Sequence, residues 1–437
     1  MLFHPRLRMS WMLALWVVAA AAASRAEAQW SQWGGPSRNF TVESEPLADD
    51  WPWFGPHKLW KRDLGDGYSS LIYDDGVLYT MYRRTMKDTT EYTVALDATT
   101  GKTLWEQAQP APFKDTGDNR WGGNGPNSTP LVVENRLYTV GSCRVLRCFE
   151  KKTGQILWQR DLTEGMTGAI GSEVAYCPSP IAYKNLIIVP LDKHQTQDAA
   201  RISIPLETRP RVEGRTMMAF DQLTGRPVWH NLDFFYTFSS PILIRFADRD
   251  QIVGCGPDGL FAVDPESGDL LWHHPKCGTA PTPVWDGVDS LLFACLEEGG
   301  TVCSSMIRLT IQDDVIVPVE QWCERRLSFN LSTPVRVGDM LVGSTESQLL
   351  AADWKTGERL WLKRGYPRAN LIVADGKLIS LDQDGNLKLL RVSRQAVEEL
   401  DDCQPLERFT FATPVLVGDI LYLRDREVIM ALDLGRH

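Results

Sequence analysis

ALDATTGKTLW (residues 95–105) sets the architecture of this chain, because its pattern returns four more times. The pattern combines an apolar residue, Asp, Thr–Gly and a final Trp at fixed spacing, with Glu150 replacing Asp once and Ser267 replacing Thr once. A short carboxylate that accepts backbone N–H groups, followed by a glycine that tolerates positive φ, predicts a tight turn between two strands. A unit repeated at this period predicts a repeat architecture. The other copies are CFEKKTGQILW (148–158), AFDQLTGRPVW (219–229), AVDPESGDLLW (262–272) and AADWKTGERLW (351–361).

A second recurring element lies between these turns: a small residue, usually followed by proline, leads into an apolar hairpin. Pairs such as Asp75–Gly76 and Asp375–Gly376 separate two apolar runs, which is a strong hairpin signal. Each unit therefore has a Pro-led strand, its hairpin partner, a strand entering the Thr–Gly turn and a strand ending in Trp. Eight such units predict the blades of a β-propeller. The units around 308–322 and 389–400 lack the Thr–Gly turn.

The two ends of the repeat region complement each other. HKLWKRDLG (57–65) resembles only the last strand of a unit, whereas 411–434 supplies three strands and stops before the fourth. We therefore predict an all-β, eight-bladed propeller of four-stranded antiparallel blades, closed by an N-terminal strand that leaves no open sheet edge. The repeated tryptophans and turn glycines are expected to pack the blades together. They are Trp60, Trp105, Trp158, Trp229, Trp272, Trp322, Trp361, Gly101, Gly154, Gly225, Gly268 and Gly357.

The first residues have the pattern of a secretory signal peptide. Arg6 and Arg8 precede the apolar run Trp11–Ala23, and Ala26–Glu27–Ala28 is a cleavage site of the A-x-A type. The run is shorter than the about 20 apolar residues that span a bilayer, although an uncleaved anchor is the alternative interpretation. We expect a periplasmic or secreted protein without a membrane span after cleavage. The expected parts are a signal peptide (1–28), an irregular N-terminal segment (29–56) and the propeller (57–437).

Composition limits the class of partner. The 437 residues are 43% hydrophobic and 10% aromatic and carry a formal charge of −10, which becomes more negative without the Arg-rich signal peptide. These values indicate a well-buried fold. The acidic balance excludes a general nucleic-acid or anionic-membrane binder, since either would need a basic face.

Nine cysteines allow disulfides in an oxidising compartment, and the odd number leaves at least one unpaired. Cys143 with Cys148, and Cys295 with Cys303, flank short turns and are candidate cross-hairpin pairs, although spacing alone leaves both open. The absence of C-x-x-C excludes haem attachment and a zinc ribbon. His273–His274 followed by Cys277 is a weak metal motif, because adjacent residues on a strand point to opposite faces.

The repeats resemble those of the pyrroloquinoline-quinone-type (PQQ-like) β-propellers. This superfamily includes quinoprotein alcohol dehydrogenases and the propeller subunit of the outer-membrane β-barrel assembly machinery. The start, QWGGPSRNF (32–40), is similar to that of exported PQQ-like repeat proteins. The resemblance covers about residues 30–434 and implies the propeller fold, whereas fold does not fix chemistry. The adjacent cysteines frequent in quinoprotein dehydrogenases are missing here, and no ligand or catalytic motif of those enzymes matches.

Strand order predicts where loops emerge. Connections from the fourth strand to the next unit, and from the second to the third strand, share one face, which we call the long-loop face. The hairpin and Thr–Gly turns occupy the opposite face, the turn face. Four long insertions of blades one to three fall on the long-loop face, where binding residues usually lie. They are 82–92, 106–127, 160–177 and 191–216.

These insertions carry cationic and amide side chains, although the whole chain is acidic. Guanidinium groups with an exposed indole and amides suit carboxylates, sugars or an extended peptide. The alternative is that they solvate the loops and pair with neighbouring carboxylates. The candidate ligand-binding residues are Arg83, Arg84, Lys114, Asn119, Arg120, Trp121, Asn124, Asn127, His194, Arg201 and Arg209.

The patterns together favour a non-catalytic exported propeller that acts as a binding or scaffold module in the cell envelope. It would present the long-loop face of blades one to three to an envelope protein or a glycan. No nucleophile–base constellation is visible, so we assign no catalytic residue and expect neither cofactor nor metal. One alternative is a quinoprotein-type dehydrogenase using PQQ and calcium. The other is a polysaccharide or small-molecule sensor, favoured by Trp121 and its amide neighbours.

Overall fold

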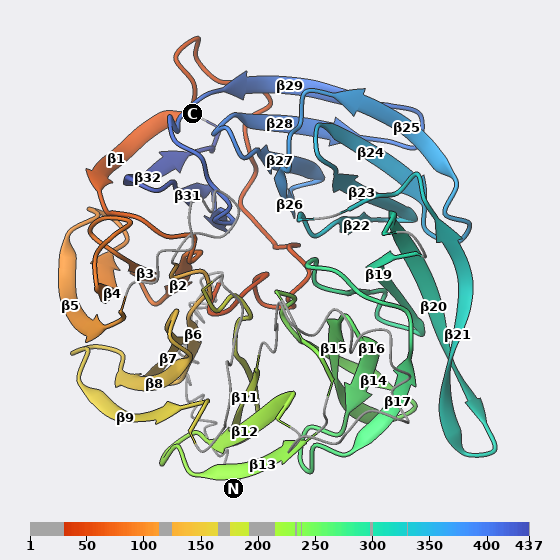
Figure 1. Cartoon of the computed structure of the whole chain (residues 1–437). Helices are drawn as coiled ribbons and strands as arrows, with labels where there is room; N and C mark the ends of the chain where they lie inside the picture. The colour runs from red at the N-terminus through yellow and green to blue at the C-terminus, as the bar shows by residue number, and fades with distance from the viewer. Residues whose placement is uncertain are drawn as a thin grey trace, which may run out of the picture.

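The repeats form a ring of eight four-stranded antiparallel sheets in a computed structural model of the chain (Figure 1). The structure describes residues 30–112, 125–164, 175–191, 215–231, 234–236, 238–297, 300–329 and 331–436. The secondary-structure elements within these ranges are all β-strands. None of the described residues belongs to a helix that is long and apolar enough to cross a membrane. The predicted eight-bladed propeller is confirmed. The predicted signal peptide lies outside the described residues.

Each of the first seven blades is a run of four consecutive strands, as the repeat pattern predicts. Blade 1 has β2 (Ile72–Asp74), β3 (Val77–Tyr82), β4 (Thr90–Asp97) and β5 (Thr103–Pro110), and blade 2 has β6 (Leu131–Val133), β7 (Arg136–Val140), β8 (Val145–Glu150) and β9 (Ile156–Asp161). Blade 3 has β10 (Ile181–Tyr183), β11 (Leu186–Pro190), β12 (Met217–Asp221) and β13 (Pro227–Asn231). Blade 4 has β14 (Ile242–Phe246), β15 (Arg249–Gly256), β16 (Gly259–Val263) and β17 (Leu270–His274).

The remaining blades follow the same order until the ring closes. Blade 5 has β18 (Val284–Trp285), β19 (Ser290–Leu296), β20 (Val302–Gln312) and β21 (Val315–Glu324). Blade 6 has β22 (Val335–Val337), β23 (Met340–Ser344), β24 (Gln348–Asp353) and β25 (Arg359–Arg364), and blade 7 has β26 (Asn370–Ala374), β27 (Lys377–Leu381), β28 (Leu387–Val392) and β29 (Val397–Cys403). Blade 8 has β30 (Val415–Val417), β31 (Ile420–Arg424) and β32 (Val428–Asp433), completed by β1 (His57–Asp63).

Ring closure rests on the antiparallel pairing of β1 with β32, from His57 opposite Asp433 to Asp63 opposite Val428. The N-terminal strand thus becomes the outer strand of the C-terminal blade, as predicted. Arg424 adds a buried clamp between blades 8 and 1, since its guanidinium donates to the Ser69, Met81 and Gly65 carbonyls at 3.1, 2.8 and 3.0 Å. Its burial lowers the pKa of Arg424 to about 10.

The repeated turn works as predicted in blade 1. The Asp97 carboxylate accepts hydrogen bonds from the Thr100 amide and hydroxyl, both at 2.7 Å, and Gly101 has a φ of 70°. The same bonds hold the pKa of Asp97 below its usual value. The Asp97 carboxylate with its two hydrogen bonds from Thr100 stabilises the turn more than a solvent-exposed salt bridge would.

Five of the motif tryptophans pack on the turn glycine of the following blade. A Cβ added to Gly101 would lie 2.6 Å from the Trp60 ring, and one added to Gly225 would lie 2.5 Å from the Trp158 ring. The indole N–H then donates to the same turn, for example from Trp60 to the Ala98 carbonyl at 2.9 Å. The equivalent glycine–indole pairs are Gly154 with Trp105, Gly268 with Trp229 and Gly357 with Trp322.

The junction between blades 4 and 5 departs from this rule. Blade 5 turns at 312–315 without the Thr–Gly sequence. The indole of Trp272 therefore donates within its own blade, to the Gln251 side chain at 2.7 Å. This junction lacks the Trp-to-turn contact that joins other blades.

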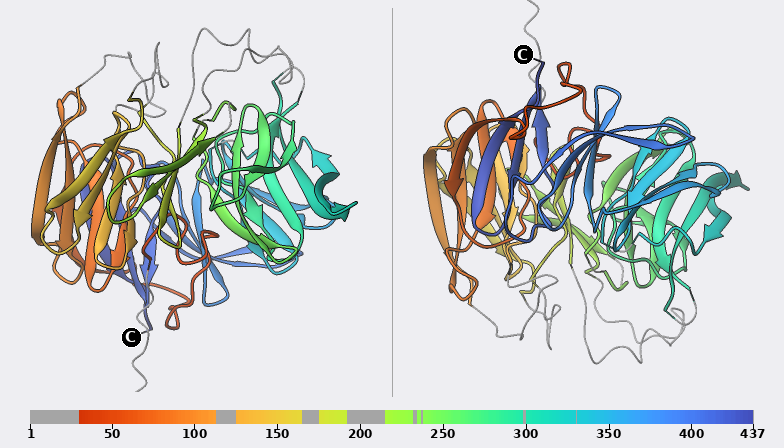
Figure 2. Two further views of the ribbon diagram at one scale, coloured as in Figure 1. Left: turned by 90° about the horizontal axis from the view of Figure 1, so that it is seen from below. Right: turned by 90° about the horizontal axis from the view of Figure 1, so that it is seen from above.

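The segment before β1 is irregular and crosses the turn face of the ring (Figures 1 and 2). Two of its side chains enter the axis: the Trp33 indole donates to the Thr282 hydroxyl at 3.2 Å, and Arg38 donates to the Pro180 carbonyl at 3.1 Å. The segment therefore occupies the axis from the turn face. Its backbone hydrogen bonds join Trp30 to Tyr73, Ser31 to Val132, Val42 to Val373 and Ala48 to Leu434.

We predict that Gly225→Ala destabilises the protein by about 3 kcal/mol, because the methyl group adds a clash with the Trp158 ring to the cost of a positive φ. Gly76→Ala is the matched control, since Gly76 has a similar φ of 75° but nothing within 4 Å of an added Cβ. Backbone strain alone should cost that variant about 1 kcal/mol. Urea denaturation measures both, and equal losses would contradict the inter-blade contact.

Candidate functional site

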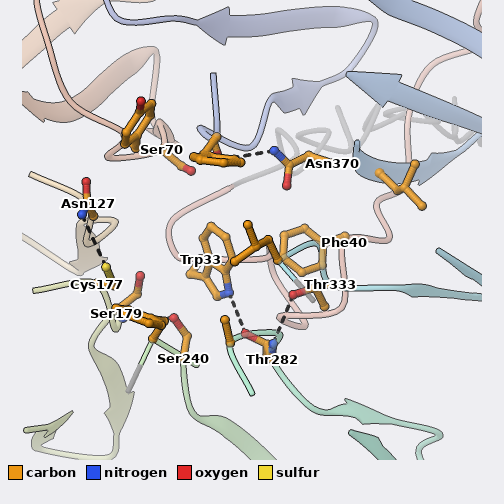
Figure 3. Close-up of a pocket in the computed structure, with 16 residues that line it drawn as sticks. Trp33, Phe40, Ser70, Asn127, Cys177, Ser179, Ser240, Thr282, Thr333 and Asn370 are labelled. Atoms are coloured by element: carbon orange, nitrogen blue, oxygen red, sulfur yellow. Dashed lines mark hydrogen bonds between the residues drawn. The ribbon is translucent and has the colours of Figure 1, made fainter. Parts of the chain in front are cut away.

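A cavity of about 230 Å³ lies on the ring axis (Figure 3). Most of its lining comes from the connections that enter the first strand of each blade, so the cavity belongs to the long-loop face. Trp33 and Phe40 of the N-terminal segment lie at its turn-face end and meet edge to face, with ring centroids 5.2 Å apart. The lining residues are Trp33, Phe40, Tyr68, Ser70, Asn127, Cys177, Ser179, Phe238, Ser240, Ala280, Thr282, Leu331, Thr333, Asn370, Leu371 and Phe411.

A ring of small polar side chains surrounds the axis, one at the start of the first strand of each blade or two residues before it. Four of these residues join neighbouring blades, because the backbone N–H of each donates to the hydroxyl of the corresponding residue in the next blade. The residues are Ser70, Thr129, Ser179, Ser240, Thr282, Thr333, Asn370 and Thr413. The hydrogen bonds run from Thr129 to Ser179 (3.0 Å), Ser179 to Ser240 (3.0 Å), Thr282 to Thr333 (3.1 Å) and Thr413 to Ser70 (2.9 Å).

The chemistry of this axial cavity is uncharged and largely apolar. Five aromatic residues and two leucines line the wall, and Tyr68 packs against Phe411 with centroids 5.3 Å apart. Polar atoms come from hydroxyls and from the amides of Asn127 and Asn370, whose side chains donate to Cys177 Sγ and to the Phe411 carbonyl. None of the described lining residues is Asp, Glu, His, Lys or Arg. The described lining therefore offers hydrogen bonds and apolar contact without a charged acid–base pair.

Arg83, one of the predicted ligand residues, is buried, with 1% of its side chain exposed. Its guanidinium donates to the carbonyls of Gly125 and Ala111 at 3.2 and 2.8 Å and pairs with Glu91 at 3.1 Å. Glu91 in turn accepts from the Ser142 amide of blade 2. Arg83 thus joins blade 1 to blade 2, much as Arg424 joins blade 8 to blade 1. Arg83 directly follows the second strand of its blade, and Arg424 is the last residue of that strand in blade 8.

The remaining ligand candidates divide by their placement. Arg84 is on the surface, with its guanidinium over the Tyr92 ring at 4.5 Å and 3.6 Å from Glu106. Asn127 lines the axial cavity, so the structure does not bring these two together with Arg83 into one site. Lys114, Asn119, Arg120, Trp121, Asn124, His194, Arg201 and Arg209 lie outside the described residues.

His273 and His274 point to opposite faces of β17, as predicted. His273 stacks on Phe234 with ring centroids 4.8 Å apart, whereas His274 faces Glu320 of blade 5 at 3.8 Å. Burial lowers the pKa of His274. The two imidazoles therefore do not form a common metal site.

Comparison with known proteins adds the family. A family model described as outer membrane protein assembly factor BamB matches residues 55–195 and 194–361, well over half of the chain. The chain belongs to the BamB family of PQQ-like propellers. No curated protein matches this member of the family significantly.

Three solved structures resemble the chain at low sequence identity, and Sqt1 among them shows the same fold. Sqt1 of Saccharomyces cerevisiae is 8% identical with a TM-score of 0.60, and the match covers 87% of this chain and all of Sqt1. BamB of Moraxella catarrhalis is 14% identical with a TM-score of 0.39, covering 84% of each chain. The quinohemoprotein alcohol dehydrogenase of Comamonas testosteroni is 13% identical with a TM-score of 0.49, covering 94% of this chain and 81% of the enzyme.

The quinoprotein alternative would need a quinone and calcium in the axial cavity. Calcium takes about six to eight oxygen ligands, with carboxylates prominent among them. The described lining supplies hydroxyl and amide oxygens but no carboxylate, and no cation for an acidic quinone. The described residues of the cavity therefore do not fit this pair of cofactors.

We predict that Arg83→Met destabilises the protein by about 3–5 kcal/mol, because it leaves the buried Glu91 carboxylate without its cation. The adjacent Arg84→Met is the control and should cost less than about 1 kcal/mol, since 65% of the Arg84 side chain is exposed. Urea denaturation of both variants measures the difference. A small effect of Arg83→Met would contradict its role as a clamp between blades 1 and 2.

Proposed function

We propose that the protein is a non-catalytic binding or scaffold module of the cell envelope, exported to the periplasm or secreted, and that it receives its partner on the long-loop face. The observation that carries this proposal is the axial cavity, which is uncharged, rich in aromatic side chains and set among the connections of that face. Such a lining favours retention of an uncharged group and offers little for proton or hydride transfer.

The partner that this arrangement fits best is an envelope protein. An aromatic or aliphatic side chain from the partner would enter the axial cavity, while the surrounding loops of blades one to three contact the rest of its surface. Buried aromatic and aliphatic anchors in central pockets supply most of the free energy of many protein interfaces. Membership of a family named for outer membrane protein assembly supports a protein partner.

A glycan or small-molecule sensor is the second candidate, and the amides of Asn127 and Asn370 beside aromatic rings favour it. Amide groups can donate to and accept from sugar hydroxyls, while an aromatic face packs on the apolar side of a sugar ring. A quinoprotein-type dehydrogenase is less favoured, because the described cavity lacks carboxylates for calcium.

The role of the axial cavity as the anchor site can be tested with the variant Ala280→Trp, whose indole would fill the cavity. Ala280 lines the cavity and is half-buried, so an indole there would occupy the space that the anchor needs. We expect the variant to remain folded by circular dichroism and to lose at least about tenfold in capture of envelope proteins after cross-linking, identified by mass spectrometry.

Val288→Trp is the matched control, because Val288 is 68% exposed in the β18–β19 turn on the opposite face. It should capture the same envelope proteins as the unaltered protein. Equal capture by Ala280→Trp would contradict the axial cavity as the anchor site. Selective loss of binding to an oligosaccharide array, with protein capture unchanged, would favour the sensor instead.

A further inference from the structure

Three cysteines from three successive strands of blade 5 converge: Cys295 of β19, Cys303 of β20 and Cys323 of β21. Cys295 and Cys303 are directly opposite each other in the strand register, with their Sγ atoms 2.9 Å apart. The Cys323 Sγ lies 3.5 Å from the Cys303 Sγ, and all three thiols lie within 4.8 Å of one another. The predicted cross-hairpin pair therefore has a third thiol beside it.

We propose that this three-thiol cluster binds a structural metal ion of the zinc type. A disulfide would use only two of the three cysteines, whereas zinc in proteins is commonly held by three or four thiolate and imidazole ligands. With a Zn–S bond of about 2.3 Å, sulfurs at the corners of a tetrahedron lie about 3.8 Å apart. The Cys295–Cys303 and Cys303–Cys323 sulfur distances of 2.9 and 3.5 Å are shorter than this value, so the thiols would move apart by up to about 1 Å to hold the ion.

The Glu297 carboxylate lies beside one of the three thiols and would have to move closer to the other two to act as a fourth ligand. Its Oε1 is 3.5 Å from the Cys323 Sγ. A tetrahedral zinc with a Zn–S bond of about 2.3 Å and a Zn–O bond of about 2.0 Å places sulfur and oxygen about 3.5 Å apart. Arg325 pairs with the same carboxylate and orients it, as partners of metal ligands commonly do.

The surroundings of the cluster suit a buried ion with negatively charged ligands. Lys276 hydrogen-bonds both the Cys323 thiol and Glu320, the latter at 2.6 Å, so a cation lies beside the thiolates. Cys295 and Cys303 are fully buried, while Cys323 is partly exposed and leaves a route for the ion to enter. A metal site needs such access as well as its ligands.

The position of the cluster gives the ion a structural role that is independent of the proposed partner binding. Lys276 follows the outer strand of blade 4 and Glu320 and Cys323 lie on the outer strand of blade 5, so these contacts bridge the two blades. This is the junction where Trp272 donates within its own blade. A metal ion would tie together three strands of blade 5, of which β21 contacts β17 of blade 4.

The test uses the full chain, purified under reducing conditions and stripped with a chelator. Addition of Zn²⁺ should give one bound ion per chain by native mass spectrometry and should raise the thermal midpoint. Co²⁺ in the same site should give the intense visible absorption of tetrahedral thiolate coordination. Cys323→Ser removes one ligand with little change of volume and should weaken zinc binding by more than about 100-fold.

Cys143→Ser is the control, because Cys143 is an exposed thiol of blade 2. It should bind zinc as the unaltered protein does. Equal affinity in Cys323→Ser, or no zinc bound by the reduced and folded chain, would overturn the proposal. So would recovery of the exported protein with a Cys295–Cys303 disulfide and no metal.

Discussion

The pairing of β1 with β32 is the contact on which the arrangement of the whole chain rests. A linear array of sheets would expose its two terminal strands, and unpaired edges invite association with other chains. Here residues from opposite ends of the sequence meet in one blade, and Arg424 adds buried hydrogen bonds across the same junction. Closure also fixes which connections share a face, and thereby places the axial cavity.

Two groups of residues with different functions surround the ring axis. Small hydroxyl residues before each first strand join neighbouring blades, so their polar atoms are used largely within the ring. The N-terminal segment then brings Trp33 and Phe40 to the turn-face end. What remains is a cavity on the long-loop face with hydrogen-bonding groups and aromatic surface, but without charged groups among its described lining.

Much of the fold could be predicted because its signals are local and repeated. Each signal can be recognised from a few adjacent residues, as in the Thr–Gly turn, the terminal Trp and the incomplete unit at 57–65. The number of blades then follows from the period at which these signals recur. The Trp–glycine contacts follow from the same period. The sequence of blade 5 also shows that this blade lacks the Thr–Gly turn.

The candidate site could be predicted only in part, because its residues come from distant connections. Trp33 and Phe40 lie in a segment without periodicity, so nothing in the sequence placed them on the axis. Arg83 was grouped with surface cations, since a single sequence does not show that Glu91 and two carbonyls enclose it. Cys323 lies on a third strand, beyond the hairpin spacing that predicted the other two thiols.

The most direct test of ring closure is a disulfide across β1 and β32. Asp63 and Val428 are opposite each other in the register, at a separation suited to a disulfide. Asp63→Cys with Val428→Cys should form an intramolecular cross-link on oxidation, identified in tryptic peptides by mass spectrometry. Asp63→Cys with Asp433→Cys, at the far end of the same strand pair, should not. Absence of the first cross-link, or equal yield of the second, would contradict the closed ring.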